Sequence, residues 1–225
     1  MPTADGLIRG SDGQSRCWWP GEDALYVAYH DGEWGRPVAD DRRRFEKLCL
    51  EGFQSGLSWL TILRKRPNFR QAFAGFDPTA IADFGDGDVE RLMADAGIVR
   101  NRAKILATIN NARRYPELVA ETGSLAAYLW SFEPDAASRP ATLDHETLMT
   151  FGVSDESKAL SRDLRRRGWA FVGPTTAYAA MEAMGIVNDH IEGCWVRPEV
   201  ERERAAFHRL SGSAPRARTG PYRRR

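Results

Sequence analysis

Cysteine is scarce in this sequence and long apolar runs are absent, which excludes two large classes of protein. Three cysteines in 225 residues are too few, and odd in number, for a scaffold built on disulfides. No run of 18 or more apolar residues occurs, and the N-terminus lacks the apolar stretch of a signal peptide. We therefore expect a cytoplasmic protein without a membrane partner.

A net charge of one sign is also lacking. The 32 Lys and Arg residues balance 31 Asp and Glu, which excludes a generally basic, nucleic-acid-coating chain. The charge is uneven, however, because residues 201–225 hold eight arginines and two glutamates. We expect flexible segments at residues 1–15 and 199–225, the second of them basic. The folded domain would span residues 16–198.

Alternating β-branched runs, the signature of strands, are hard to find as well. Apolar residues instead recur at helical spacing, between polar N-caps and Gly or Pro stops. The sequence therefore predicts an all-α fold. The expected helices cover residues 42–60, 77–84, 88–97, 101–115, 124–132, 155–167 and 175–184.

Four residues have the chemistry of metal ligands: Cys17, His30, His190 and Cys194. His190 and Cys194 are four residues apart, which places both on one face if the segment is helical. Two Cys and two His complete a closed tetrahedral zinc site of the structural kind, and such a site would join the two ends of the domain. Spacing alone leaves two alternatives open: buried apolar thiols, or a cysteine nucleophile with a histidine base. Cys49 lies on an apolar helix face and is expected in the core.

Large aromatic side chains are concentrated near the N-terminal end. Six rings fall within 42 residues: Trp18, Trp19, Tyr26, Tyr29, Trp34 and Trp59. Core packing explains such a cluster in many proteins. The functional alternative is a stacking pocket for a flat ligand such as a nucleobase.

Glu51 favours the stacking pocket, because it lies in a run of mostly apolar or small residues, LCLEGFQSGLSWL. In one continuous helix, Trp59 would lie about 80° around the axis from Glu51, two turns along. One helix would then present a carboxylate and an indole to the same cavity. A carboxylate in such surroundings is desolvated and has a perturbed pKa, unless the glutamate faces solvent or pairs with a cation.

Residues 88–112 predict a helical hairpin with a turn at Gly97 and Ile98. The second helix would offer free backbone N–H groups to an anion, with Arg100 and Lys104 close by. A DNA backbone can be held in this way without reading its sequence. Many helix pairs share a Gly turn, so this pattern is weak on its own. The arginine run 165–167 is more typical of a solvated face.

In long strings that agree in order and spacing, the chain resembles the 3-methyladenine DNA glycosylase I family over residues 16–198. The matching segments include RCWW (16–19), ALYVAYHDGEWG (24–35), FEKLCLEGFQSGLSWLTILRKR (45–66), DAGIVRNRAKI (95–105) and VNDHIEGC (187–194). The resemblance implies an all-α helix-hairpin-helix glycosylase with a structural Zn²⁺ held by the four candidate ligands.

The resemblance also implies roles for individual residues. The carboxylate that recognises the base falls on Glu51, and the stacking aromatics fall on Tyr29 and Trp59. Further pocket aromatics are Trp19, Tyr26 and Trp34, and the loop that wedges into the duplex corresponds to Gly56 and Leu57. The chain departs from the family pattern at Ala24, Trp18 and Trp195, which affects packing beside the zinc ligands.

The implied activity is a monofunctional glycosylase that flips 3-methyladenine out of double-stranded alkylated DNA, excises it by hydrolysis and leaves an abasic site. We expect a monomer. No Asp or Glu after the predicted hairpin has a motif that supports a role as general base, and no lysine is placed for Schiff-base chemistry and strand cleavage. The alternatives are a non-catalytic helix-hairpin-helix DNA-binding protein, in which the aromatic cluster is core, and a zinc-stabilised protein that acts on a small molecule.

Overall fold

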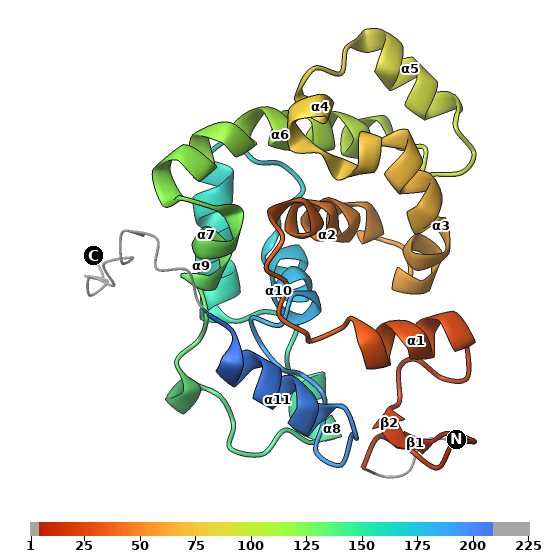
Figure 1. Ribbon diagram of the computed structural model, residues 1–225, viewed down its shortest axis with the longest axis vertical. Helices are drawn as coiled ribbons and strands as arrows, with labels where there is room; N and C mark the ends of the chain where they lie inside the picture. Colours follow the sequence, from red (N-terminus) through yellow and green to blue (C-terminus); the bar gives the residue numbers. More distant parts are fainter. Residues whose placement is uncertain (1–4, 209–225) are drawn as a thin grey trace, which may run out of the picture.

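The computed structural model describes residues 5–208, and this part of the chain is mostly helical (Figure 1). The strands are β1 (Leu7–Arg9) and β2 (Ser15–Cys17). The α-helices are α1 (Ala24–Gly32), α2 (Asp41–Gln54), α3 (Trp59–Ala72), α4 (Pro78–Ala82), α5 (Asp86–Ala94), α6 (Arg102–Thr122), α7 (Leu125–Trp130), α8 (His145–Met149), α9 (Asp155–Arg166), α10 (Pro174–Ala183) and α11 (Arg197–Ala206). A predominantly helical fold is therefore confirmed, and most predicted helices are present with shifted ends.

The N-terminal segment differs from the expected flexible stretch, because β1 and β2 form an antiparallel pair in which Leu7 faces Cys17. A turn between them is closed by the backbone N–H of Gly10, which donates to the carbonyl of Gln14 at 2.9 Å. At the other end, α11 covers the first residues of the expected basic tail. The rest of that tail, residues 209–225, lies outside the described part of the chain.

The predicted helix over residues 42–60 is wrong, because the structure has two helices there. α2 ends at Gln54, and α3 begins only at Trp59. Gly56 lies between them at φ +81°, a conformation that side chains other than glycine disfavour. The hydroxyl of Ser58 then caps α3 by accepting from the N–H of Thr61 at 3.2 Å. Glu51 and Trp59 therefore come from different helices.

Helix α2 runs through the middle of the fold, where it contacts α3, α7 and α10 (Figure 1). Its apolar side chains, among them Phe45, Leu48 and Phe53, are almost completely buried in the main core. Cys49 belongs to this core, as expected. Since the helix is surrounded on several sides, even its polar residues near the C-terminal end are withdrawn from water, and this burial positions the site described below.

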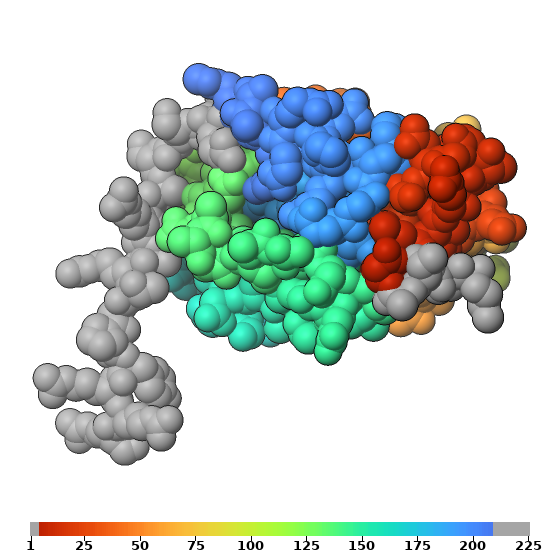
Figure 2. Space-filling model, turned by 90° about the horizontal axis from the view of Figure 1, so that it is seen from below, coloured from red at the N-terminus to blue at the C-terminus, as the bar shows by residue number. Residues whose placement is uncertain are grey.

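A second, smaller core lies where the two ends of the domain meet. It contains Cys17, Ile191 and Cys194, with Trp18 and Trp195 packed against it. The N-terminal and C-terminal segments lie side by side in the space-filling view (Figure 2). The backbone N–H of Trp195 also donates to the carbonyl of Ser15 at 2.9 Å. Trp18 and Trp195, which depart from the family pattern, thus help to fill this second core.

Candidate active site and metal centre

A cavity of about 220 Å³ lies between α1, α2, α3 and α10. The residues that line it are Trp19, Tyr26, Tyr29, Trp34, Glu51, Gln54, Trp59, Ala179 and Glu182, and we call it the base pocket. It is smaller than pockets for drug-sized ligands, which run from about 300 to 1,000 Å³. The structure brings together Glu51 and all five aromatic residues that the sequence analysis assigned to base binding.

The aromatic rings form the walls of the pocket and brace one another. The rings of Tyr29 and Trp59 are 5.4 Å apart between centroids, and those of Trp19 and Tyr26 are 4.8 Å apart. Trp34 packs edge-on against Trp19 at 5.0 Å. Mutual contacts of this kind fix ring orientations, so the walls are preformed for a flat, apolar-faced ligand. The aromatic cluster therefore lines a cavity and is not only part of the packed core.

Glu51 supplies a carboxyl group to this aromatic pocket. The residue is only 5% exposed. Burial raises its pKa to about 7, although the neighbouring Lys47 acts in the opposite direction. A carboxylate can only accept hydrogen bonds, whereas its protonated form can also donate one. The charge of the pocket therefore changes close to neutral pH.

Three lining residues were missed by the sequence analysis: Gln54, Ala179 and Glu182. Gln54 lies one turn after Glu51 on α2, a spacing that gives it the same face and was a usable signal. Its amide also donates to the carbonyl of Leu57 at 2.7 Å. Glu182 comes from α10, and nothing in its local sequence indicates the pocket. Burial, Asp189 and Glu51 together raise the pKa of Glu182 well above its ordinary value.

The loop between α2 and α3 forms the rim next to the pocket, since Gln54 and Trp59 at its two ends both line the cavity. Gly56 and Leu57 lie in this loop, and Leu57 is an exposed large hydrophobic residue. An apolar side chain held in water beside a cavity is available to another molecule. The structure thus places the predicted wedge residues beside the pocket that would receive a flipped base.

The four candidate metal ligands lie together and are all buried. Their ligating atoms fall within 4.8 Å of one another. Cys17 comes from β2 and His30 from α1, whereas His190 and Cys194 come from the segment between α10 and α11. That segment is a turn and not the helix considered from the sequence, with Gly193 at φ +85°. These residues can therefore hold a metal that joins the two ends of the domain.

Hydrogen bonds orient both imidazoles toward the cluster. Nδ1 of His30 is 2.7 Å from a carboxylate oxygen of Asp31, which leaves Nε2 free to face Cys194. Nε2 of His190 is 3.1 Å from the carbonyl oxygen of Trp34, which leaves Nδ1 on the cluster side. Partners of this kind on the outer ring nitrogen are typical of metal-binding histidines.

The thiols are electrostatically coupled. Hydrogen bonds from Cys17, His190 and His30 lower the pKa of Cys194, whereas the hydrogen bond to Cys194 and burial raise the pKa of Cys17. One thiolate forms readily in this cluster, but a second one needs a nearby cation. A bound metal ion supplies that charge.

The predicted DNA-binding hairpin is formed by α5 and α6, joined through residues 95–101. The N–H of Gly97 donates to Asp95 at 2.7 Å, and the ammonium of Lys65 donates to the carbonyl of Ala96 at 2.8 Å. Arg100 is exposed, whereas the side chain of Ile98 is buried in the core. The turn is therefore held by these hydrogen bonds, and Arg100 presents its guanidinium at the surface.

Lys104 does not share the surface position of Arg100, contrary to the expectation of a phosphate contact. It is 7% exposed, and its ammonium donates to the carbonyls of Phe53 at 2.8 Å and Ser55 at 2.6 Å. These carbonyls end α2, where a cation is favoured by the helix dipole. Lys104 thus ties α6 to the loop beside the base pocket.

A second helical hairpin was missed by the sequence analysis. α9 and α10 are packed together, and Gly173 precedes the first residue of α10 without a side-chain cap. The arginines of this region differ in their contacts. Arg167 forms ion pairs with Glu121 and Asp163, whereas Arg165 is exposed. The usable signal was the Gly-Pro pair that opens α10.

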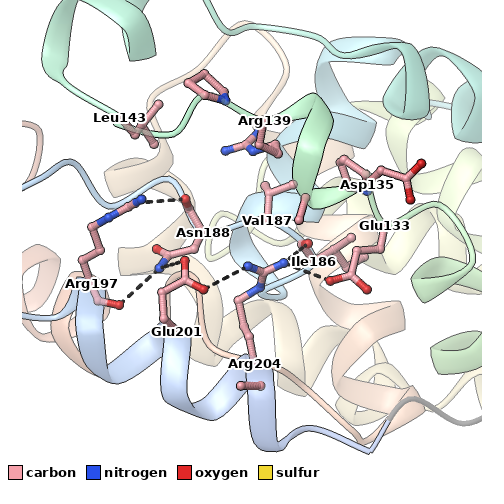
Figure 3. Close-up of a pocket in the computed structure, with 14 residues that line it drawn as sticks. Glu133, Asp135, Arg139, Leu143, Ile186, Val187, Asn188, Arg197, Glu201 and Arg204 are labelled. Carbon is pink, nitrogen blue, oxygen red and sulfur yellow. Dashed lines mark hydrogen bonds and ion pairs between the residues drawn. The ribbon is translucent and has the colours of Figure 1, made fainter.

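A larger cavity of about 510 Å³ lies on α11, next to the segment that follows α7 (Figure 3). Its arginines are already engaged: Arg139 pairs with Asp189, Arg204 pairs with Glu133 at 3.0 Å, and Arg197 pairs with a nearby glutamate. None of the described residues that line it is aromatic. Since these residues offer neither a stacking surface nor an unneutralised cation, the base pocket remains the candidate active site.

No helix in the described part of the chain is long and apolar enough to cross a membrane. The chain is similar to DNA-3-methyladenine glycosylase 1 of Escherichia coli (strain K12), with 46% identity over 184 residues that cover 81% of this chain and 97% of the relative.

The chain is also similar to solved structures of 3-methyladenine DNA glycosylase I. A crystal structure of 3-methyladenine DNA glycosylase I (TAG) superposes with a TM-score of 0.74 at 45% identity, covering 81% of this chain and 100% of that one. A structure on 3-methyladenine recognition by the Staphylococcus aureus enzyme has a TM-score of 0.75 at 34% identity, covering 81% and 96%. The methyladenine glycosylase family model matches residues 19–197. The chain therefore belongs to the methyladenine glycosylase family.

Proposed function

We propose that this protein is a monofunctional DNA glycosylase that excises 3-methyladenine from alkylated DNA and leaves an abasic site. The observation that carries the proposal is a buried carboxyl, Glu51, in an aromatic pocket sized for one base. Two supports are independent of this geometry: the family, and relatives whose names state this activity. A damaged base is also held poorly in the duplex, which lowers the cost of flipping it out.

The chemistry fits the groups present. Adenine methylated at N3 in DNA is cationic, so its glycosidic bond is already weakened and the base leaves neutral. A general acid to protonate the leaving group is then unnecessary. Tyr29 and Trp59 would stack on the cation, and Glu51 would accept hydrogen bonds from the base edge and stabilise its charge. Trp19, Tyr26 and Trp34 would complete the pocket, while water attacks C1′ of the sugar.

Binding of the free base tests this assignment without DNA. Pocket tryptophans stack against a bound purine, so titration with 3-methyladenine is expected to quench intrinsic fluorescence, whereas adenine at the same concentration has little effect. Trp59→Phe keeps a ring in the wall and should weaken binding less than Trp59→Ala. If adenine and 3-methyladenine quench equally, the pocket does not select the methylated base.

We further propose that the Cys17, His30, His190 and Cys194 cluster binds Zn²⁺ structurally. Two thiolates and two imidazoles are preferred zinc ligands, and four of them leave no open position for catalysis. With Zn–N and Zn–S bonds of about 2.1 and 2.3 Å, a tetrahedral site has N···S edges of ~3.6 Å. The N···S distances that involve Cys194 are 3.5 and 3.6 Å. The ion would hold the N-terminal segment to the segment before α11.

Double-stranded DNA would lie across the pocket mouth, with Leu57 and Gly56 entering the duplex where the base leaves it. For the phosphate backbone, Gly97, Ile98 and Arg100 of the α5–α6 turn are the contacts expected from the sequence. The N-terminus of α10 is a competing position, because α10 also lines the base pocket through Ala179 and Glu182.

Paired arginine variants distinguish the two hairpins. Arg100→Ala is expected to weaken DNA binding and to lower the slope of log K against log salt by about 1, because one phosphate contact is lost. The measurement is fluorescence anisotropy with duplex DNA over a range of salt concentrations. Arg165→Ala, in the last turn of α9 on the other hairpin, serves as the comparison. If only Arg165→Ala changes the slope, DNA lies on the α9–α10 hairpin and the assignment to Gly97, Ile98 and Arg100 is wrong.

The two remaining assignments are the oligomeric state of the protein and its location in the cell. We propose that it acts as a monomer, because each chain contains a complete base pocket and a complete ligand cluster. The cytoplasm remains the proposed location, and the curated relative named above comes from a bacterium. Sedimentation at working concentrations, with and without duplex DNA, tests the monomer.

A further inference from the structure

Lys47 is a buried lysine next to the base pocket. It lies on α2 and is 5% exposed, and its ammonium nitrogen has no hydrogen-bond partner among residues 5–208. A buried ammonium without hydrogen bonds is costly, whereas a methionine of similar length would pack there without that cost. The charge of Lys47 is therefore not explained by packing.

The groups around Lys47 place its charge behind the pocket wall. Its Nζ lies 5.1 Å from the centre of the Tyr29 ring, yet Lys47 itself does not line the pocket. The nearest carboxylate, of Glu33, is 4.0 Å away, and the guanidinium of Arg66 already binds that carboxylate through two 2.7 Å contacts. Arg43 approaches the same carboxylate at 3.9 Å. Glu33 is thus largely neutralised by other cations.

Glu51 is the carboxyl that remains for Lys47. It follows Lys47 by four residues on α2, a spacing that brings side chains together on one helix face. The other titratable groups that face Glu51 are Tyr26 and Tyr29 on α1 and Glu182 on α10. None of these three is a cation at neutral pH. Lys47 is therefore the cation coupled to the pocket carboxyl.

We propose that Lys47 is a positioning residue of the base pocket, whose ammonium, behind Tyr29 and one turn before Glu51, keeps the Glu51 carboxyl negatively charged toward a cationic base. The inference rests on the proposed function, since it assigns a role within that site. Lys47 does not touch the base. It acts through Glu51, so its loss changes the pH at which the site works rather than the shape of the site.

The direction of the effect follows from the charges. Burial raises the pKa of Glu51 to about 7 while Lys47 lowers it, and burial lowers the pKa of Lys47 to about 8 while Glu33 and Glu51 raise it. Without the lysine charge, burial acts on Glu51 unopposed and its pKa rises further. The carboxylate then forms only at higher pH, and the acidic limb of the activity profile moves upward.

The test is the pH profile of single-turnover release of 3-methyladenine between about pH 5.5 and 9. In Lys47→Met the midpoint of the acidic limb is expected to rise by about one pH unit, a loss of about tenfold at pH 6.5 that recovers at high pH. Lys47→Arg keeps the charge and should restore the original midpoint. Lys158→Met, an exposed lysine on α9, controls for a general loss of charge.

A rate that falls equally at every pH in Lys47→Met would make Lys47 a purely structural residue and overturn the proposal. A ¹³C NMR titration of the Glu51 carboxyl, assigned by its absence from Glu51→Gln, gives a readout that does not depend on turnover. If the unaltered protein releases no base at any pH, the proposed function fails, and this titration still decides the role of Lys47. A Glu51 titration that is the same with and without the lysine charge overturns it in either case.

Discussion

Glu51→Gln is expected to lower kcat/KM for release of 3-methyladenine from DNA by about 100-fold, the size of effect seen when one preorganised electrostatic contact is removed. Glutamine keeps the shape of the side chain but lacks the negative charge that stabilises a cationic base. Glutamine also replaces one of the two acceptor oxygens of the carboxylate by an NH₂ group. That group is a donor and cannot pair with a donor on the edge of the base. Release is measured under single-turnover conditions, with the thermal midpoint recorded in parallel.

A matched control for this variant lies one turn and a half earlier on the same helix. Glu46 is 6% exposed, close to the 5% of Glu51, but it pairs with Arg70 and does not line the base pocket. Glu46→Gln is therefore expected to affect stability more than release. The role assigned to Glu51 is wrong if Glu51→Gln binds the free base as tightly as the unaltered protein.

Removal of the proposed zinc ion is expected to lower Tm by about 10 °C. Loss of a structural metal costs several kcal/mol of folding free energy, and each kcal/mol corresponds to roughly 2–4 °C in a chain of this size. The physical reason is the cross-link, because the ion would join the segment around Cys17 to that around Cys194. Metal content and Tm are measured before and after chelation, and then for Cys194→Ser.

Cys49 provides the control for the metal prediction. It is a buried cysteine like Cys17 and Cys194, but it belongs to the main core and not to the ligand cluster. Cys49→Ser should leave the metal content unchanged and keep the response to chelation. Purified protein that contains no zinc, and whose Tm does not respond to chelation, would contradict the assignment.

The base pocket was largely predictable because its residues are close in sequence. Trp19, Tyr26, Tyr29 and Trp34 cluster around α1, and the polar Glu51 in an apolar run signals an unusual environment. The metal ligands were recognisable by chemical type, although 160 residues separate the two pairs. In both cases the residue types themselves indicate the chemistry of the site, namely metal binding for Cys and His and ligand stacking for the aromatic residues.

Other features depended on how helices meet, which local sequence does not encode. Glu182 enters the pocket from α10, so only tertiary packing brings it near Glu51. Lys104 has the pattern of a surface cation, yet its ammonium caps the end of α2. The break between α2 and α3 was missed because the apolar period continues across Gly56, whose positive φ ends the first helix. The glycine turn and the Ser58 cap of α3 therefore determine the helix boundary here, and the helical spacing of apolar residues does not.

The central claim is that the pocket around Glu51 excises 3-methyladenine from DNA. Its most direct test is release of free bases from dimethylsulfate-treated duplex DNA by the purified, metal-loaded protein, separated by chromatography, with Glu51→Ala in parallel. We predict that 3-methyladenine appears selectively and that Glu51→Ala strongly reduces it. Release of no methylated base by well-folded protein, or equal release by Glu51→Ala, would contradict this account.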